Sequence, residues 1–215
     1  MTQNIHMSQP LHSLGPAPEL QGLAAILIHG RTQSPADMFA IAARLDLPSL
    51  PYIALQAAGK SWYPDKFMAP VEANQPNLDF ALARIEELVL TLERSGVPRS
   101  RIVLIGFSQG ACLACEYIYR NPERWGGVVA YTGGLIGPEG MSWLTSKTLD
   151  GTPILLGNSD VDQWVPLQRT NETAEVFRSM GALVQLKIYP GMEHVVNDDE
   201  IALGRELLKQ LLSTS

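Results

Sequence analysis

The sequence lacks an apolar run of the ~20 residues that a membrane-spanning helix requires. It also lacks a surplus of basic residues, since 22 acidic against 16 basic side chains give a net charge of −6. This balance argues against a nucleic-acid partner, because phosphate binding needs clustered lysine and arginine. The first residues, MTQNIHMSQPLHSLG, have neither the basic start nor the apolar core of a secretory signal. We therefore expect a cytoplasmic protein without a membrane span.

Cysteine is scarce, with only two residues, Cys112 and Cys115. Their C-x-x-C spacing is that of a redox pair or of half a metal site. They fall inside a predicted helix, however, where a free cysteine behaves as a small buried hydrophobe. No second Cys/His pair with metal-ligand spacing occurs in the sequence. We expect two buried thiols and no metal site.

The 215 residues fit a single domain, in which short apolar runs alternate with longer amphipathic segments. The predicted strands are 24–29, 52–55, 101–106, 128–132, 154–157 and 183–189. The predicted helices are 35–45, 78–93, 109–120, 167–180 and 200–212. This alternation predicts a mostly parallel α/β sheet with helices on both faces. Residues 1–22 are expected to form an extension or an edge strand, with His6 and His12 exposed to solvent.

The pentapeptide GFSQG at 106–110 follows an aliphatic run and precedes a predicted helix. A buried strand, a G-x-S-x-G turn and a helix form the layout of a nucleophile elbow. The turn strains the backbone of the serine, and a Cβ on either glycine would collide with it. Ser108 is the predicted nucleophile, and the alternative is an ordinary glycine-rich turn.

A serine nucleophile needs a histidine base and an acid that fixes the histidine tautomer. In a hydrolase with this elbow, the acid and then the histidine follow the serine along the chain. Of the four histidines, only His194 follows Ser108, just beyond the last predicted strand. The loop after strand 154–157 offers two acids. Asp162 is favoured because it precedes a Val-Pro pair that can open the next helix, whereas Asp160 could brace the loop.

An oxyanion hole requires two preorganised N–H donors. The backbone N–H of Gln109 follows the nucleophile, and that of Arg31 lies in the loop after strand 24–29. The Arg31 side chain is expected to form a surface ion pair. The aromatic and proline-rich segment 57–76 is either a flap over a pocket or a surface loop. Candidate pocket side chains are Trp62, Tyr63, Phe67 and Trp164.

Taken together, these residues resemble the phospholipase/carboxylesterase family of the α/β-hydrolase superfamily, which includes acyl-protein thioesterases. Five motifs in order carry the resemblance, which extends from residue 23 onward: ILIHGR (26–31), WYP (62–64), GFSQG (106–110), DxxVP (162–166) and GxxH (191–194). The resemblance implies an α/β-hydrolase fold. It assigns nucleophile, acid and base to Ser108, Asp162 and His194, and the oxyanion positions to Arg31 and Gln109.

The resemblance also implies a small-molecule carboxylic ester as substrate and no cofactor. Short- to medium-chain or aryl esters are expected, because the segments that could cover a pocket are short. An acyl thioesterase or a lysophospholipase is the alternative, and a catalytically silent ligand-binding fold is a remote one. Two more residues precede DxxVP than in typical thioesterases, so Asp160 also remains a candidate acid. Relatives in the family often form homodimers, which makes a homodimer an alternative to a monomer.

Overall fold

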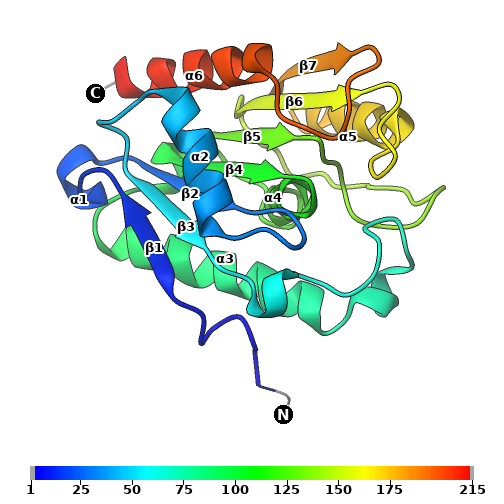
Figure 1. Ribbon diagram of the computed structural model, residues 1–215, viewed down its shortest axis with the longest axis horizontal. Coiled ribbons are helices and arrows are strands. Elements are labelled where there is room, and N and C mark those ends of the chain that lie inside the picture. The colour runs from blue at the N-terminus through cyan, green and yellow to red at the C-terminus, as the bar shows by residue number, and fades with distance from the viewer. Residues whose placement is uncertain (1–2, 214–215) are drawn as a thin grey trace.

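A sheet of seven strands crosses the computed structural model, which describes residues 3–213 (Figure 1). In order across the sheet, the strands are β1 (Leu11–Leu14), β3 (Tyr52–Leu55), β2 (Ala24–Ile28), β4 (Ile102–Phe107), β5 (Gly127–Tyr131), β6 (Pro153–Ser159) and β7 (Leu183–Tyr189). The strands from β3 to β7 run parallel, and β1 is an antiparallel edge. Every residue of β2, β4 and β5 is buried, as expected for aliphatic strands covered on both faces.

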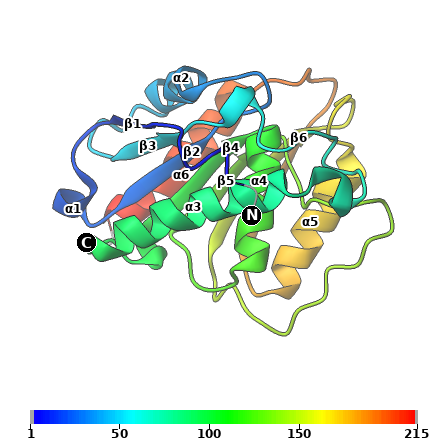
Figure 2. The same cartoon turned by 90° about the horizontal axis from the view of Figure 1, so that it is seen from below.

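Helices cover both faces of this sheet (Figures 1 and 2). They are α1 (Pro18–Gln21), α2 (Pro35–Leu45), α3 (Asn77–Arg94), α4 (Gln109–Arg120), α5 (Leu167–Ser179) and α6 (Asp198–Ser213), with single 3-10 turns at Ala58–Lys60, Val71–Asn74 and Arg99–Arg101. On one face, Met38 of α2 and Leu208 of α6 join the buried strand residues. On the other, Ile85 of α3, Leu113 of α4 and Phe177 of α5 do so. The predicted mostly parallel α/β architecture is confirmed.

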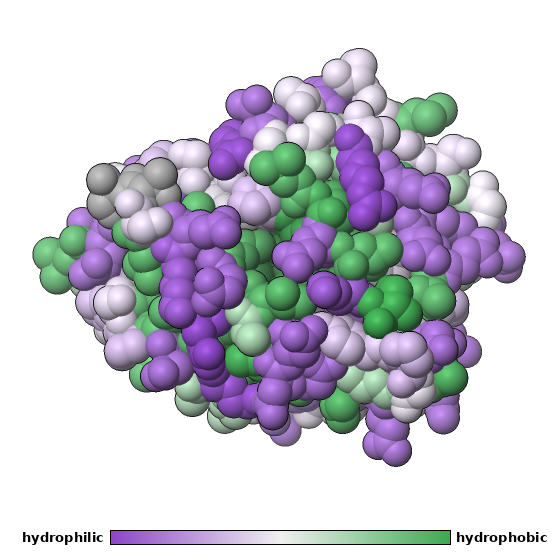
Figure 3. Space-filling view, turned by 90° about the horizontal axis from the view of Figure 1, so that it is seen from above, coloured by the Kyte–Doolittle hydropathy of each residue, from purple (hydrophilic) through white to green (hydrophobic). Residues whose placement is uncertain are grey.

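Helix α6 is amphipathic. Ile201 and Leu208 are buried against the sheet, while Leu203, Leu207 and Leu211 pack there only partly buried. Seen from the side that carries α6, hydrophobic side chains gather near the middle of the face and hydrophilic ones surround them (Figure 3). Within residues 3–213, no helix combines the length and the apolar character needed to cross a bilayer.

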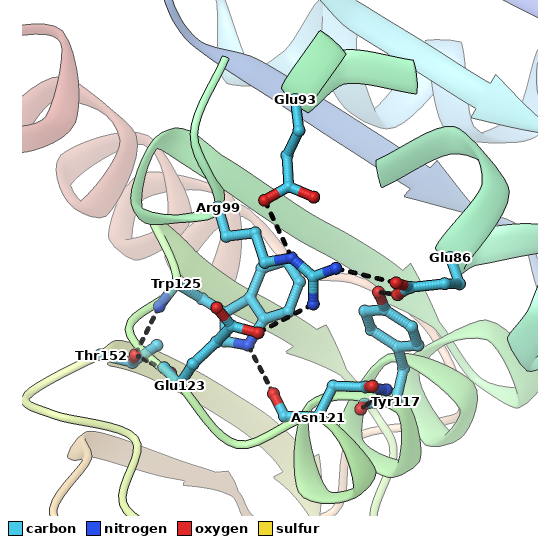
Figure 4. A network of polar contacts seen from close by, with 8 residues as sticks. All are labelled: Glu86, Glu93, Arg99, Tyr117, Asn121, Glu123, Trp125 and Thr152. Atoms are coloured by element: carbon cyan, nitrogen blue, oxygen red, sulfur yellow. Dashed lines mark hydrogen bonds and ion pairs between the residues drawn. The ribbon is translucent and has the colours of Figure 1, made fainter. Parts of the chain in front are cut away.

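Arg99, at the amino ends of the strands, connects α3 with the segment before β5 (Figure 4). Its guanidinium forms ion pairs with Glu86 and Glu123 at 2.8 Å and with Glu93 at 3.2 Å. It also lies over the Trp125 ring, 5.3 Å from the ring centroid. Because these partners come from α3 and from the segment before β5, this end of the sheet is fixed by structural contacts. The opposite, carboxyl end carries the loops that hold the candidate site.

The predicted strands and helices all occur, with boundaries within two residues of those expected. The N-terminal segment provides the edge strand β1, but one expectation for this segment was wrong. His6 is fully buried, because the chain folds back over the segment that follows β3. Its Nε2 lies 3.0 Å from the carbonyl oxygen of Trp62, and its Nδ1 accepts a hydrogen bond from the Ala58 N–H at 3.1 Å. His12 is half-buried and bonds the Gln56 side chain at 3.0 Å.

Candidate active site

Ser108 occupies the sharp turn between β4 and α4 with a strained backbone, at φ 54° and ψ −120°. The neighbouring glycines allow this turn. A Cβ on Gly106 would collide with the carbonyl of Gly110, and a Cβ on Gly110 would collide with the carbonyl of Ile28 on β2. The Ser108 N–H donates to the carbonyl of Tyr131 at 3.0 Å, which fixes the turn against β5. The elbow therefore presents the Ser108 hydroxyl at the carboxyl end of the sheet.

The structure brings Ser108, His194 and Asp162 into one line of hydrogen bonds. Ser108 Oγ lies 2.8 Å from His194 Nε2, and His194 Nδ1 lies 2.6 Å from Asp162 Oδ2. With the carboxylate accepting from Nδ1–H, Nε2 is free to accept the serine proton. The His194 side chain is 20% exposed and the Asp162 side chain only 1%, so the imidazole is open to solvent while its acid partner is shielded. Phe107 flanks the imidazole, with ring centroids 5.0 Å apart.

The two aspartates of the loop after β6 have separate contacts. Besides His194, Asp162 accepts the backbone N–H groups of Trp164 and Val165, both through Oδ1 at 2.8 Å. Asp160 does not reach the imidazole and instead accepts the Gly191 N–H at 2.8 Å. Asp160 therefore braces the loop that carries His194, and Asp162 orients the ring itself.

The backbone around Arg31 and Gln109 leaves N–H groups available near the elbow. Gln109 is the first residue of α4, so its N–H has no acceptor within the helix. In the loop after β2, Gly30 N–H donates to Gln33 Oε1 at 2.9 Å and Thr32 N–H donates to the Lys60 carbonyl at 2.8 Å. Among residues 3–213, no acceptor is found for the Arg31 N–H. Both predicted oxyanion donors are thus N–H groups for which the described residues provide no acceptor.

The side chain of Arg31 does not form the expected ion pair with any carboxylate of the described residues. Instead its guanidinium donates to three consecutive carbonyls, those of Tyr63 at 2.9 Å, Pro64 at 2.8 Å and Asp65 at 2.6 Å. The bend at 63–65 thus offers the guanidinium three backbone acceptors in place of a carboxylate. Segment 57–76 is therefore fastened to the loop that carries the Arg31 N–H.

The candidate pocket residues do not form an open groove. Trp62 and Tyr63 are fully buried in the main hydrophobic core and Phe67 is buried beside them, whereas Trp164 is 66% exposed next to Asp162. A cavity of about 110 Å³ lies at the start of α5, lined by Met68, Glu139, Pro166, Gln168, Arg169 and Glu172. A second, of about 280 Å³, is lined by Leu14, Gly15, Ala42, Ala43, Asp46, Leu47, Pro48 and Tyr52. Neither cavity includes Ser108.

Cys112 and Cys115 are free and buried in α4, as expected. Burial raises the pKa of the Cys112 thiol to about 12 and that of Cys115 well above its usual value, so both remain protonated and inert. Among residues 3–213, no cluster of three or more His, Cys, Asp or Glu side chains could hold a metal ion.

Several residues that support the site were not singled out in the sequence. Asn158 donates to the Val165 carbonyl at 3.0 Å and to Thr170 Oγ1 at 2.7 Å, which closes the loop around Asp162. His29 accepts the Ala57 N–H at 3.1 Å and lies against Trp62. The place of Asn158 at the end of a predicted strand was an available signal. His29 belongs to the ILIHGR motif, but its contacts with Ala57 and Trp62 depend on the tertiary fold and could not be predicted from the sequence.

A mostly parallel sheet with helices on both faces and a serine on a strained strand-to-helix turn defines an α/β-hydrolase. The model of the phospholipase/carboxylesterase family matches residues 21–212, and the chain belongs to this family. Among solved structures, a phospholipase/carboxylesterase from Dyadobacter fermentans is similar, with 38% identity and a TM-score of 0.89 over 94% of this chain and 97% of that one. The carboxylesterase of Bacillus cereus shares the fold, with 16% identity and a TM-score of 0.75 over 98% of this chain and 100% of that one.

Relatives with a shorter alignment carry two kinds of name. Acyl-protein thioesterase 1 of Saccharomyces cerevisiae is 29% identical over 62% of this chain and 60% of its own length. A probable carboxylesterase of Oryza sativa subsp. japonica is 24% identical over 72% of this chain and 59% of its own length. The chain thus aligns with less than two thirds of these relatives. Family and comparisons support an esterase- or thioesterase-type hydrolase.

Proposed function

We propose that this protein is a serine carboxylesterase that hydrolyses short- to medium-chain or aryl esters through an acyl-enzyme. The observation that carries the proposal is the continuous line from Asp162 through His194 to Ser108, with hydrogen bonds of 2.6 and 2.8 Å. This is the arrangement that activates a serine hydroxyl, because each group orients the next and the proton has a place to go.

In the first step, His194 Nε2 takes the proton of Ser108 as Oγ attacks the acyl carbonyl. The Arg31 and Gln109 N–H groups bind the resulting oxyanion, and each donor contributes about 100- to 1000-fold to turnover. His194 then gives the proton to the departing alcohol. A water molecule, deprotonated by the same imidazole, hydrolyses the acyl-enzyme and restores Ser108. Asp162 stays ionised throughout and stabilises the imidazolium.

The preference for small acyl groups is supported by the burial of Trp62 and Tyr63, which offer no open apolar groove beside Ser108. The main alternative is an acyl thioesterase or a lysophospholipase. The names of the relatives support an acyl thioesterase as much as a carboxylesterase. Long-chain substrates would have to use exposed apolar side chains near the site, such as Trp164, Val161 and Val195.

A panel of p-nitrophenyl esters and acyl thioesters of graded chain length tests both possibilities. We expect turnover to be highest with short and medium acyl esters. A rate that rises steadily with chain length, or thioesters that exceed esters, would favour the alternative. Ser108→Ala should lower ester turnover by about a million-fold while the melting temperature stays close to that of the wild type. Failure of a fluorophosphonate to label Ser108 would instead indicate a silent ligand-binding fold.

A further inference from the structure

His6 lies outside the part of the chain that the family model matches, yet it is fully buried and contacts Ala58 and Trp62 in segment 57–76. Nδ1 accepts the Ala58 N–H, so the ring proton is on Nε2, which donates to the Trp62 carbonyl. Burial lowers the pKa of His6 and keeps the ring neutral, as this pair of bonds requires. One imidazole thus fastens both ends of the turn between Ala58 and Trp62.

Trp62 in turn forms hydrogen bonds with His29 before the Arg31 loop and with Gln109 after Ser108. Its ring lies close to two imidazoles, with centroids 5.4 Å from His6 and 5.0 Å from His29. Its indole N–H donates to the His29 carbonyl at 2.8 Å, two residues before Arg31. Its backbone N–H donates to Gln109 Oε1 at 2.9 Å, and Gln109 Nε2 donates to the Tyr63 carbonyl at the same distance.

The same turn also contacts the loop after β2 directly, because the Lys60 carbonyl accepts the Thr32 N–H at 2.8 Å. Thr32 has a positive φ of 67°, which ordinary residues adopt only when their surroundings hold them there. Arg31, whose N–H is the second proposed oxyanion donor, precedes it. The two donor residues are therefore both held by the segment that His6 fastens.

We propose that His6 is a positioning residue for the oxyanion hole: through Trp62 it holds the backbone of Arg31 and of Gln109 in register with Ser108. The inference rests on the proposed serine esterase function. It makes the N-terminal segment part of the catalytic architecture, although this segment contributes no group that touches the substrate. Without the two bonds of His6, the buried Trp62 carbonyl would be unpaired and the half-buried Ala58 N–H would lose its acceptor, so the turn would shift to satisfy them.

Such a shift is expected to lower kcat rather than to raise KM, because the oxyanion exists only after the substrate has been attacked. His6→Phe keeps a ring against Trp62 and loses both hydrogen bonds. His6→Gln retains an amide that can donate to the Trp62 carbonyl. His12→Phe is the matched control, since His12 lies on β1 in the same segment and bonds Gln56 instead.

The experiment measures kcat and KM on a short p-nitrophenyl ester, with active sites counted by complete fluorophosphonate labelling. The inhibition constant of a trifluoromethyl ketone, whose tetrahedral adduct carries an oxyanion, is measured in parallel. For His6→Phe we expect kcat to fall about 10- to 100-fold with KM within about threefold, as befits a displaced rather than a deleted donor. Binding of the ketone to His6→Phe should weaken by a similar factor. His6→Gln should recover part of the loss in kcat and in ketone binding, and His12→Phe should match the wild type in both.

An unchanged kcat in His6→Phe, an equal loss in His12→Phe, or a kcat loss without weaker ketone binding would overturn the inference. A wild-type protein that hydrolyses no ester would overturn the proposed function itself, which separates the two failures. Thermal melting reports whether each variant folds. Should His6→Phe unfold, His6→Asn carries the same test, because its amide oxygen can still accept the Ala58 N–H while the bond to Trp62 is lost.

Discussion

Asp160 Oδ1 accepts a hydrogen bond from the backbone N–H of Gly191 at 2.8 Å, and thereby joins the loop after β6 to the loop after β7. Two residues further along the first loop, Asp162 contacts the imidazole of His194 on the second. The two loops are thus linked by two hydrogen bonds, one from the Gly191 backbone to Asp160 and one from the His194 ring to Asp162. The neighbouring aspartates divide the tasks of positioning the loop and orienting the base.

This division predicts different effects for the same substitution at the two positions. Asp162→Asn should lower kcat about 10⁴-fold, because an amide cannot hold the imidazole in the tautomer that accepts the serine proton. Asp160→Asn should lower kcat less than about tenfold, since its amide oxygen still accepts the Gly191 N–H. Steady-state kinetics on one p-nitrophenyl ester compares them. A crippled Asp160→Asn beside an active Asp162→Asn would reverse the assignment.

The sequence predicted the sheet, the helices and the place of Ser108 because these depend on local patterns, and it predicted His194 because no other histidine follows Ser108. Aliphatic runs mark buried strands, and the elbow is a five-residue signature. The contacts of His6 join residues 56 positions apart, and no local pattern indicates them. Composition likewise predicted an aromatic segment at 57–76 without telling which rings face inward. Trp62 and Tyr63 are buried in the core, and Gln109 and Arg31 bond their backbone, a relationship that exists only in the folded chain.

The attachment of segment 57–76 should depend on the several N–H donors of the Arg31 guanidinium rather than on its charge. Arg31→Lys retains the charge but lacks the planar fork that bonds all three carbonyls, so we expect it to loosen segment 57–76 almost as much as Arg31→Met does. Each variant should be cleaved faster in this segment by limited proteolysis and lose about tenfold or more in kcat/KM. Lys66→Met, in the same segment, is the control. Full protection in Arg31→Lys would show that charge alone suffices.

Gly110 is predicted to be intolerant of any side chain. Its Cα lies against the carbonyl of Ile28, so the Cβ of Gly110→Ala would force β2 and α4 apart. We expect a loss of about 3 kcal/mol or more in the free energy of unfolding, or an insoluble protein. Gly22→Ala is the matched control. Gly22 has a positive φ of 57° but no neighbour near its Cβ position, so it should lose only about 1–2 kcal/mol. Urea denaturation compares the two variants, and equal losses would contradict the steric explanation.

Glu200 makes the stability of the fold depend on pH. The carboxyl is buried in the first turn of α6, where Oε2 accepts the Asn197 N–H at 2.9 Å and Oε1 has no partner within the described chain. Burial raises its pKa to about 7, and the nearby Asp199 adds to the rise. The unfolded chain has a carboxyl pKa of about 4.3, so between these values the folded state binds more protons than the unfolded state. Stability contributed by this group is therefore full below about pH 4 and is lost as pH rises to about 7.

Glu200→Gln should remove this dependence, because its amide oxygen can still accept the Asn197 N–H and no charge is buried. Relative to the wild type, the variant should gain up to about 1.4 kcal/mol in unfolding free energy for each pH unit through the window, and a few kcal/mol by pH 8. Urea denaturation at pH 5 and pH 8 measures the change. Glu206→Gln, on the exposed side of the same helix, should leave the difference between the two pH values as it is in the wild type. If Glu200→Gln retains the wild-type difference, Glu200 is ionised in the folded protein and another group sets the pH dependence.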